Sequence, residues 1–325
     1  MAERSIRLLV WADYLAPAVL SRFEVETGIH VDGAWYTGED EAAARVLAGE
    51  GFDVVVASDY MAERYRRAGA LQPLDLDRLP GLAGITDPRL RKPPYDPETD
   101  GRKYTSGLYF GTEGLAVRID DVSHFPSSWE IVFDPQFAGR IAMLAGAREV
   151  LSAALYLLGE SPNSTDSDAL ERATTMLIDQ RPLVARYDSD TPWRSIVEGV
   201  TIVHCFGGDV GRAINKGVTQ VRYIRPREGF TIWIDGPCIP VSAADPDAAH
   251  RFIEFLLDPG VAAATADYSG DHPVVSAAEP LMRSLVQRSM RPTSEQIETG
   301  TFLADLGDFN AVYESSYRRV RGAAA

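Results

Sequence analysis

The first 56 residues contain three short apolar segments, namely IRLLVW at residues 6–11, IHVDG at 29–33 and FDVVV at 52–56. Each has the length and composition of a β-strand. The stretches between them are PAVLSRFEVE at 17–26 and an alanine-rich one at 40–49, and both carry apolar residues at helical spacing. Strands that alternate with helices in this way predict a parallel, doubly wound α/β sheet.

The carboxyl ends of parallel strands are where such α/β proteins bind their ligands. Trp11 to Tyr14 follow the first predicted strand, and Ser58 to Tyr60 follow the third. We therefore expect functional side chains in these two turns.

A second α/β region is predicted in the middle of the chain, with strands at 141–144 and 200–204 and helices at 148–158 and 166–180. The segment 73–104 precedes this region. It is rich in proline, aspartate and arginine and has little periodicity. We expect it to run over the surface.

Two extended segments, 107–117 and 229–235, are suited to cross between the two α/β regions. Two lobes joined by two crossovers describe a hinged clamp, whose ligand lies between the lobes. The tail at 294–321 is predicted to be helical and to pack on the second lobe. The expected lobes are 1–110 with 236–279, and 111–235 with 280–325.

Acidic residues outnumber basic residues by 47 to 32, which gives a formal net charge of −15. Nucleic acids and anionic membranes attract positive surfaces, so neither is an expected partner. No segment approaches the ~18 consecutive apolar residues of a membrane span. Cys205 and Cys238 lack the spacing of a disulfide framework or a zinc site. No signal peptide is visible, which predicts either a cytoplasmic protein or the processed form of an exported one.

A series of short motifs follows these predicted elements in order. Among them are WADY at 11–14, GFDVVVAS at 51–58, GTEGL at 111–115, FGGD at 206–209 and FLLDP at 255–259. In order and spacing the motifs resemble the polyamine-binding branch of the bacterial ABC-transporter solute-binding proteins, over nearly the whole chain. The resemblance implies a type II periplasmic-binding-protein fold, no catalysis, a spermidine-like or putrescine-like ligand and a membrane permease as partner. It also implies a periplasmic or cell-surface location, and we expect a monomer.

A linear polyamine carries ammonium groups separated by apolar methylene spacers. A site for it needs carboxylates, because an unpaired ammonium is costly to bury. It also needs aromatic faces, each of which attracts a cation by roughly 0.5 to 2 kcal/mol. Asp235 is the carboxylate expected to matter most. The resemblance assigns ligand contacts to Trp11, Asp13, Tyr14, Tyr60, Glu149, Phe206, Asp209, Trp233 and Asp235.

Several positions depart from the pattern of that family, among them Ala12, Phe206 and Leu303, and three further departures alter its acids. Spermidine binders have an acid where this chain has Gly146. Conversely, Glu113 and Asp271 stand where the family has a small or hydroxylated residue and a tyrosine. We include Glu113 and Asp271 among the candidate ligand groups, because carboxylates that share one cleft repel one another and favour a cation. The expected ligand is a cationic amine, either a short diamine or a guanidino or amino-alcohol relative of one.

Three of the candidate acids also have a structural interpretation. Asp13 and Asp209 lie near predicted helix starts and are suited to cap those helices. Glu149 falls in a first helical turn, where the helix dipole favours any acid.

The alternative function is an enzyme or a sensor built on the same fold with an altered cleft. His204 with Cys205, and His272 beside Asp271, are the residues that would serve an enzyme. No phosphate-binding loop, nucleophile elbow or zinc motif accompanies them. A buried cysteine and two structural histidines are the favoured interpretation, and we expect neither a cofactor nor a metal.

Overall fold

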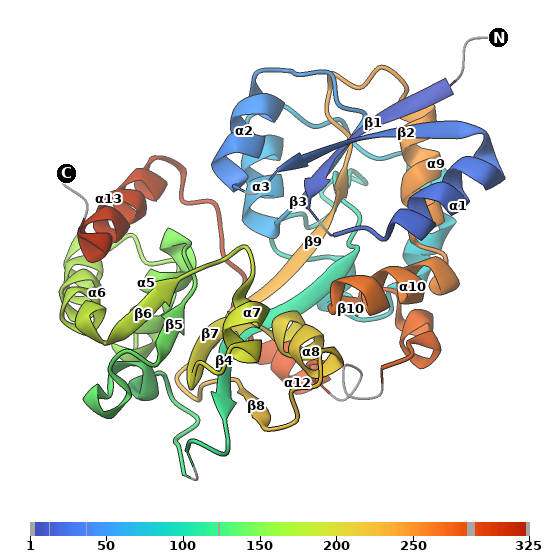
Figure 1. The fold of residues 1–325 in the computed structure, drawn as a ribbon. Helices are drawn as coiled ribbons and strands as arrows, with labels where there is room; N and C mark the ends of the chain where they lie inside the picture. The colour runs from blue at the N-terminus through green and yellow to red at the C-terminus, as the bar shows by residue number, and fades with distance from the viewer. Residues whose placement is uncertain (1–3, 13, 37, 123, 285–289, 323–325) are drawn as a thin grey trace. The chain divides into compact units, whose positions relative to one another are not determined.

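A computed structural model shows how the chain divides (Figure 1). Unit 1 comprises Met1–Phe110 and Trp233–Ser294, and unit 2 comprises Gly111–Ile232 and Glu295–Ala325. Both units are discontinuous in sequence, because the chain leaves unit 1, returns to it and leaves it again. The structure describes residues 4–12, 14–36, 38–122, 124–284 and 290–322.

Ten strands are described. They are β1 (Arg4–Trp11), β2 (Ile29–Tyr36), β3 (Val54–Ala57), β4 (Tyr109–Arg118), β5 (Ile141–Met143), β6 (Val184–Tyr187), β7 (Ile202–Phe206), β8 (Val221–Ile224), β9 (Ile232–Cys238) and β10 (His272–Pro273).

The described α-helices are α1 (Pro17–Thr27), α2 (Glu39–Leu47), α3 (Asp59–Arg67), α4 (Pro88–Arg91), α5 (Ala147–Leu157), α6 (Ser167–Gln180), α7 (Pro192–Val197), α8 (Gly207–Asn215), α9 (Pro246–Leu256), α10 (Pro259–Ser269), α12 (Ser294–Thr299) and α13 (Asn310–Arg321). Short 3₁₀ helices are η1 (Leu76–Arg78), η2 (Pro80–Gly84), η3 (Trp129–Phe133), η4 (Pro135–Phe137), η5 (Arg181–Leu183), η6 (Ser276–Leu281) and η7 (Gly307–Phe309).

The sheet of unit 1 has the strand order β2-β1-β3-β9. Strand β1 pairs in parallel with both β2 and β3, whereas β9 is antiparallel to β3. All four residues of β3 are buried, as the apolar sequence predicted. Helices α2 and α3 lie on one side of the strands and α1 and α9 on the other (Figure 1). The predicted doubly wound α/β arrangement is confirmed, and it brings the turns after β1 and β3 to the same edge of the sheet.

The segment 73–104 is not the surface excursion that its composition predicted. It consists largely of short helical turns and irregular backbone, and it buries Leu79, Ile85, Leu90 and Tyr95. Each turn contributes one apolar side chain to the core, so the sequence shows no period. The prediction was wrong because proline and aspartate mark turns, whether or not those turns are covered.

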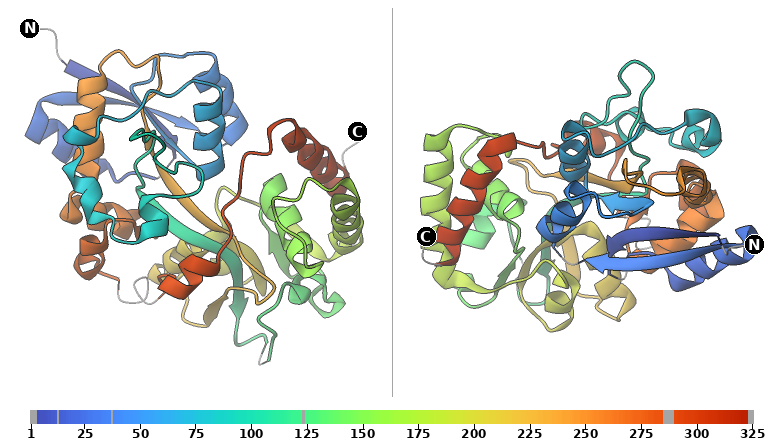
Figure 2. Two further views of the ribbon diagram at one scale, coloured as in Figure 1. Left: turned by 180° about the vertical axis from the view of Figure 1, so that it is seen from behind. Right: turned by 90° about the horizontal axis from the view of Figure 1, so that it is seen from above.

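The sheet of unit 2 has the order β4-β7-β5-β6, with β8 also paired to β4. Strand β7 is antiparallel to β4 and parallel to β5. Helices α5, α6 and α13 pack together, as both views in Figure 2 show. The predicted helical tail is interrupted: an extended stretch and η7 separate α12 from α13.

The two crossover segments run beside each other in both units. In unit 1 the Leu108 amide donates a 2.8 Å hydrogen bond to the carbonyl of Asp235. In unit 2 the Glu113 amide donates a 2.9 Å bond to the carbonyl of Thr231. A side chain at Gly236 would place its Cβ 1.8 Å from the carbonyl oxygen of Ser106, so only glycine allows this approach.

None of the described helices is long and apolar enough to cross a membrane. Both cysteines, Cys205 and Cys238, are free and buried, and burial raises the pKa of each thiol. Neither thiol is therefore an activated nucleophile.

Candidate functional site

The turn after β1 and the middle of β9 form the aromatic and acidic group of unit 1. The Tyr14 hydroxyl donates a 2.5 Å hydrogen bond to Oδ2 of Asp235. The rings of Trp11 and Tyr14 lie 5.1 Å apart between centroids, and Tyr109 meets Tyr14 edge-on at 5.0 Å. Trp11 is partly exposed, whereas Tyr14 is 9% exposed. The turn thus presents a partly exposed aromatic ring next to a tyrosine that binds a carboxylate.

Asp235 lies in an environment that disfavours its negative charge. Desolvation raises the pKa of Asp235 well above its usual value, and the nearby carboxylates Asp59 and Asp271 raise it further. The hydrogen bond from Tyr14 opposes this shift only in part. Asp59 and Asp271 are themselves buried. A bound cation would relieve this repulsion, because it stabilises the ionised form of each carboxylate.

Tyr60 lies in the first turn of α3, shortly after β3, and its hydroxyl donates a hydrogen bond to Oε2 of Glu39 on α2. Glu39 was not predicted from the sequence, where it is one of three consecutive acids at a helix start. Trp233 lies on β9 and is partly exposed. Asp271 follows Gly270, which ends α10 in the left-handed conformation at a φ of 89°. Asp13 lies outside the described residues.

The leading acid of unit 2 is Glu149, in the first turn of α5. It is partly exposed. Burial, together with the negative charge of Glu113, raises the pKa of Glu149 to about 7. Glu149 therefore changes its charge near neutral pH, where a free carboxyl group would stay ionised.

Gly146 explains how the Glu149 carboxyl group is placed. Gly146 is the N-cap of α5, and a Cβ built there would lie 1.9 Å from Oε2 of Glu149. The carboxyl group folds back over the helix start and fills this space. The side chain of an acid at position 146 would occupy the same space. This conformation of Glu149 therefore depends on the glycine at position 146.

Glu113 is hydrogen-bonded to His204 in the interior of unit 2. Its Oε1 lies 2.6 Å from Nε2 of His204, and the two side chains are 1% and 0% exposed. The two residues lie on neighbouring strands, Glu113 on β4 and His204 on β7. The register of these strands pairs Glu113 with Phe206, two residues beyond His204. Trp129 packs edge-on against the His204 ring at 5.1 Å. In this position Glu113 acts on Glu149 through its charge, and direct contact of Glu113 with a ligand stays a prediction.

Phe206 and Asp209 form the start of α8. Oδ2 of Asp209 accepts a 3.1 Å hydrogen bond from the amide of Phe206, the residue that precedes the helix. The helix begins at Gly207, so Asp209 is its third residue and not the residue before it. Asp209 thus binds the helix start from inside the first turn, and its contact with a ligand stays a prediction.

The residues that would serve an enzyme are placed in the core. His204 and Cys205 are both 0% exposed, and His272 is 3% exposed. In the described part of the chain, no group of three or more His, Cys, Asp or Glu residues is arranged to hold a metal ion.

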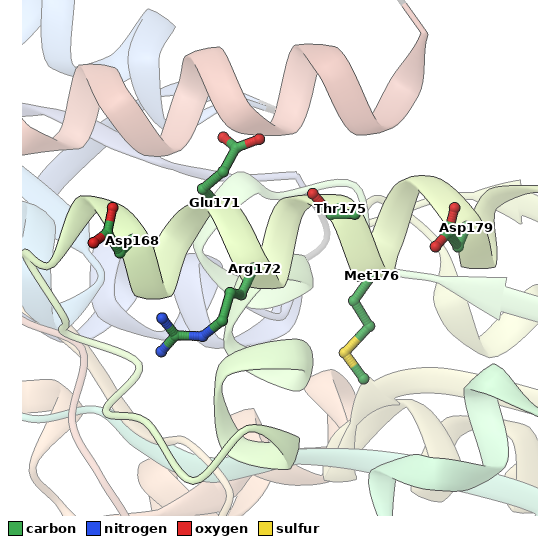
Figure 3. A pocket seen from close by; sticks show the side chains of 6 residues that line it. All are labelled: Asp168, Glu171, Arg172, Thr175, Met176 and Asp179. Atoms are coloured by element: carbon green, nitrogen blue, oxygen red, sulfur yellow. The ribbon is translucent and has the colours of Figure 1, made fainter.

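A shallow surface hollow lies elsewhere, along the outer face of α6 (Figure 3). Glu171 points toward α13, where it binds Arg319 at 2.6 Å, and Arg172 binds Glu160 at 2.7 Å. These charges already satisfy one another, and none of the predicted ligand residues lines the hollow. The lining residues are Asp168, Glu171, Arg172, Thr175, Met176 and Asp179.

Known proteins resemble this chain over most of its length. Residues 18–287 match the model of the family described as bacterial extracellular solute-binding proteins. The spermidine/putrescine-binding periplasmic protein of Escherichia coli (strain K12) is 30% identical over 96% of this chain and 90% of that protein. The putrescine/agmatine-binding protein of Pseudomonas aeruginosa is 30% identical over 89% of this chain and 82% of that protein. Among solved structures, a putative spermidine/putrescine ABC transporter from Listeria monocytogenes is 27% identical with a TM-score of 0.90, over 98% of this chain and 99% of that chain.

Proposed function

Because this chain belongs to the bacterial extracellular solute-binding proteins, we propose that its solute is a linear cationic amine, which it delivers to an ABC permease. The two relatives described above are named for spermidine, putrescine and agmatine. Each of these compounds carries several positive charges on an aliphatic chain. The relatives are named as binding proteins, in agreement with the expectation that this chain is not an enzyme.

The observation that carries this proposal is the group formed by Trp11, Tyr14 and Asp235 in unit 1. Asp235 is held by the Tyr14 hydroxyl at 2.5 Å and repelled by two neighbouring acids. An ammonium group at this carboxylate would relieve the repulsion, while the exposed part of Trp11 would cover the adjoining methylene groups. An anionic solute would meet the opposite situation, because it would add to the repulsion.

Unit 2 supplies a second acid for the same ligand. Glu149 and the buried charge of Glu113 together favour a positive group near the start of α5. We propose that acids of both units bind the same amine molecule. Its capture would then bring the units together by hinge motion at β4 and β9. Capture outside the cytoplasm, followed by release to the permease, completes the proposed role.

Isothermal titration calorimetry tests the proposal with a small set of solutes. Putrescine, spermidine and agmatine are expected to bind, whereas γ-aminobutyrate, which replaces one charged amine by a carboxylate, is not. Binding of γ-aminobutyrate alone would contradict the proposal, because it would show that the site selects a zwitterion.

A further inference from the structure

The aromatic group of unit 1 continues beyond Trp11 to a second carboxylate. The Trp11 ring lies 4.8 Å from the ring of Tyr36 and 5.1 Å from the ring of Tyr14, between centroids. Tyr36 is 3% exposed and donates its hydroxyl proton to the carbonyl of Val56 at 2.9 Å. Trp11 therefore contacts both tyrosine rings and is the partly exposed member of this aromatic cluster.

Each tyrosine of this cluster has a carboxylate near it. Tyr14 binds Asp235 directly. Glu39, whose charge acts on Tyr36, accepts the hydroxyl proton of Tyr60, which is one of the residues assigned to the ligand. The pKa of buried Tyr36 is raised by burial first and then by the charge of Glu39, and Asp235 contributes to the same shift. Tyr36 is thus within electrostatic reach of both acids.

We propose that Glu39 is a further ligand-binding residue, which pairs with a second ammonium group of the amine while Asp235 pairs with the first. This inference rests on the proposed function. The two acids would match two ammonium groups, and the aromatic cluster would match the methylene chain that joins them. The arrangement selects a compound with two charged ends over a compound with one.

The helix dipole is the competing explanation for an acid at this position. Glu39 opens α2, where a negative charge stabilises the helix. Two further acids, Asp40 and Glu41, occupy the same turn and serve the dipole equally well. Only Glu39 among them binds Tyr60, on the neighbouring helix α3. The dipole therefore accounts for an acidic turn but not for the direction that the Glu39 carboxylate takes.

The matched pair Glu39→Gln and Glu41→Gln separates the two explanations. Both variants remove one charge from the same helical turn, and glutamine at position 39 still offers an oxygen to the Tyr60 hydroxyl. Each variant is titrated by calorimetry with putrescine and with n-butylamine, which has a similar chain and one ammonium group. Thermal unfolding of both variants checks that α2 remains folded.

Glu39→Gln is expected to weaken putrescine binding by about 10- to 100-fold, because a charge-assisted bond to one ammonium group is lost. Its effect on n-butylamine is expected to stay below about threefold, and Glu41→Gln is expected to change neither affinity by more than that. Equal losses of affinity for the two amines would show that Glu39 only positions Tyr60. A change in putrescine affinity no larger than that caused by Glu41→Gln would show that Glu39 does not contact the ligand. Either result overturns the inference. A wild-type protein that binds no amine would overturn the proposed function as well.

Discussion

At the scale of single residues, the leading candidates for ligand binding are carboxylates whose negative charge the protein environment disfavours. Tryptophans and acids at strand ends could be selected from the sequence, because the doubly wound pattern locates those ends. Glu39 could not be selected in this way. In the sequence it is one acid among three, and only the position of Tyr60 on the next helix distinguishes it from Asp40 and Glu41.

Replacement of Asp235 by asparagine tests the leading carboxylate. We expect amine binding to weaken by about 2 to 4 kcal/mol, because the variant leaves a buried ammonium group underpaired. Calorimetric titration with putrescine measures the change. Asp247→Asn is the control, since it removes the same charge from an exposed position on α9. A loss below about tenfold for Asp235→Asn would place this residue outside the site.

Glu149 should make the stability of the ligand-free protein depend on pH. Its pKa is about 7 in the folded protein, above the value of 4.5 for a free side chain. A raised carboxyl pKa contributes stability that is fully present below about pH 4.5 and is lost as the pH rises through about 7. Glu149→Gln is therefore expected to gain about 1 to 3 kcal/mol over the wild type at about pH 8 and little at about pH 4. Urea unfolding at both pH values measures this difference, and a gain that is equal at the two would contradict the assignment.

At the scale of elements, most of the strands and helices predicted from the sequence are those whose apolar residues recur at a regular spacing. Several elements without such a spacing were missed. The strands and helices up to β3 lie within a few residues of their predicted positions, whereas α3 was not predicted. Strands β6 and β8 were missed because half-exposed strands of four residues carry too few apolar side chains to form a pattern. The tail was predicted as one helical region, but two helices with an extended stretch between them have the same average composition.

Gly236 should be essential to the crossover that contains it. Alanine at this position would bring Cβ within 1.8 Å of the Ser106 carbonyl oxygen, which belongs to backbone and has no free rotation to escape. We expect Gly236→Ala to lower the free energy of unfolding by about 3 kcal/mol or more. Gly51→Ala is the control, because its Cβ would meet only the Arg7 side chain at 3.8 Å. Chemical denaturation of the two variants compares them, and equal stability would mean that the crossover strands can separate at little cost.

At the scale of the whole molecule, the family assignment expected from the motifs is confirmed by a match that spans residues 18–287. No single motif is specific to that family, and their order along the chain carries the assignment. The choice of amine could not be predicted in the same way. It depends on which acids face the solute, and that the departures at Gly146, Glu113 and Asp271 change this set stays a prediction.

The net charge of −15 should accelerate capture of a polyamine without fixing its affinity. Charges spread over the surface act at long range and are screened within about 10 Å at 0.1 M salt, whereas buried carboxylates are screened much less. Raising the salt concentration from about 0.01 to about 0.1 M is therefore expected to slow spermidine association several-fold and to leave its dissociation rate nearly unchanged. Stopped-flow fluorescence of the native tryptophans measures both rates, with N-acetylputrescine as a singly charged comparison whose association should respond less. If salt instead increased the dissociation rate, the acids that hold the ligand would have to be exposed to solvent, in conflict with the desolvation that raises the pKa of Asp235.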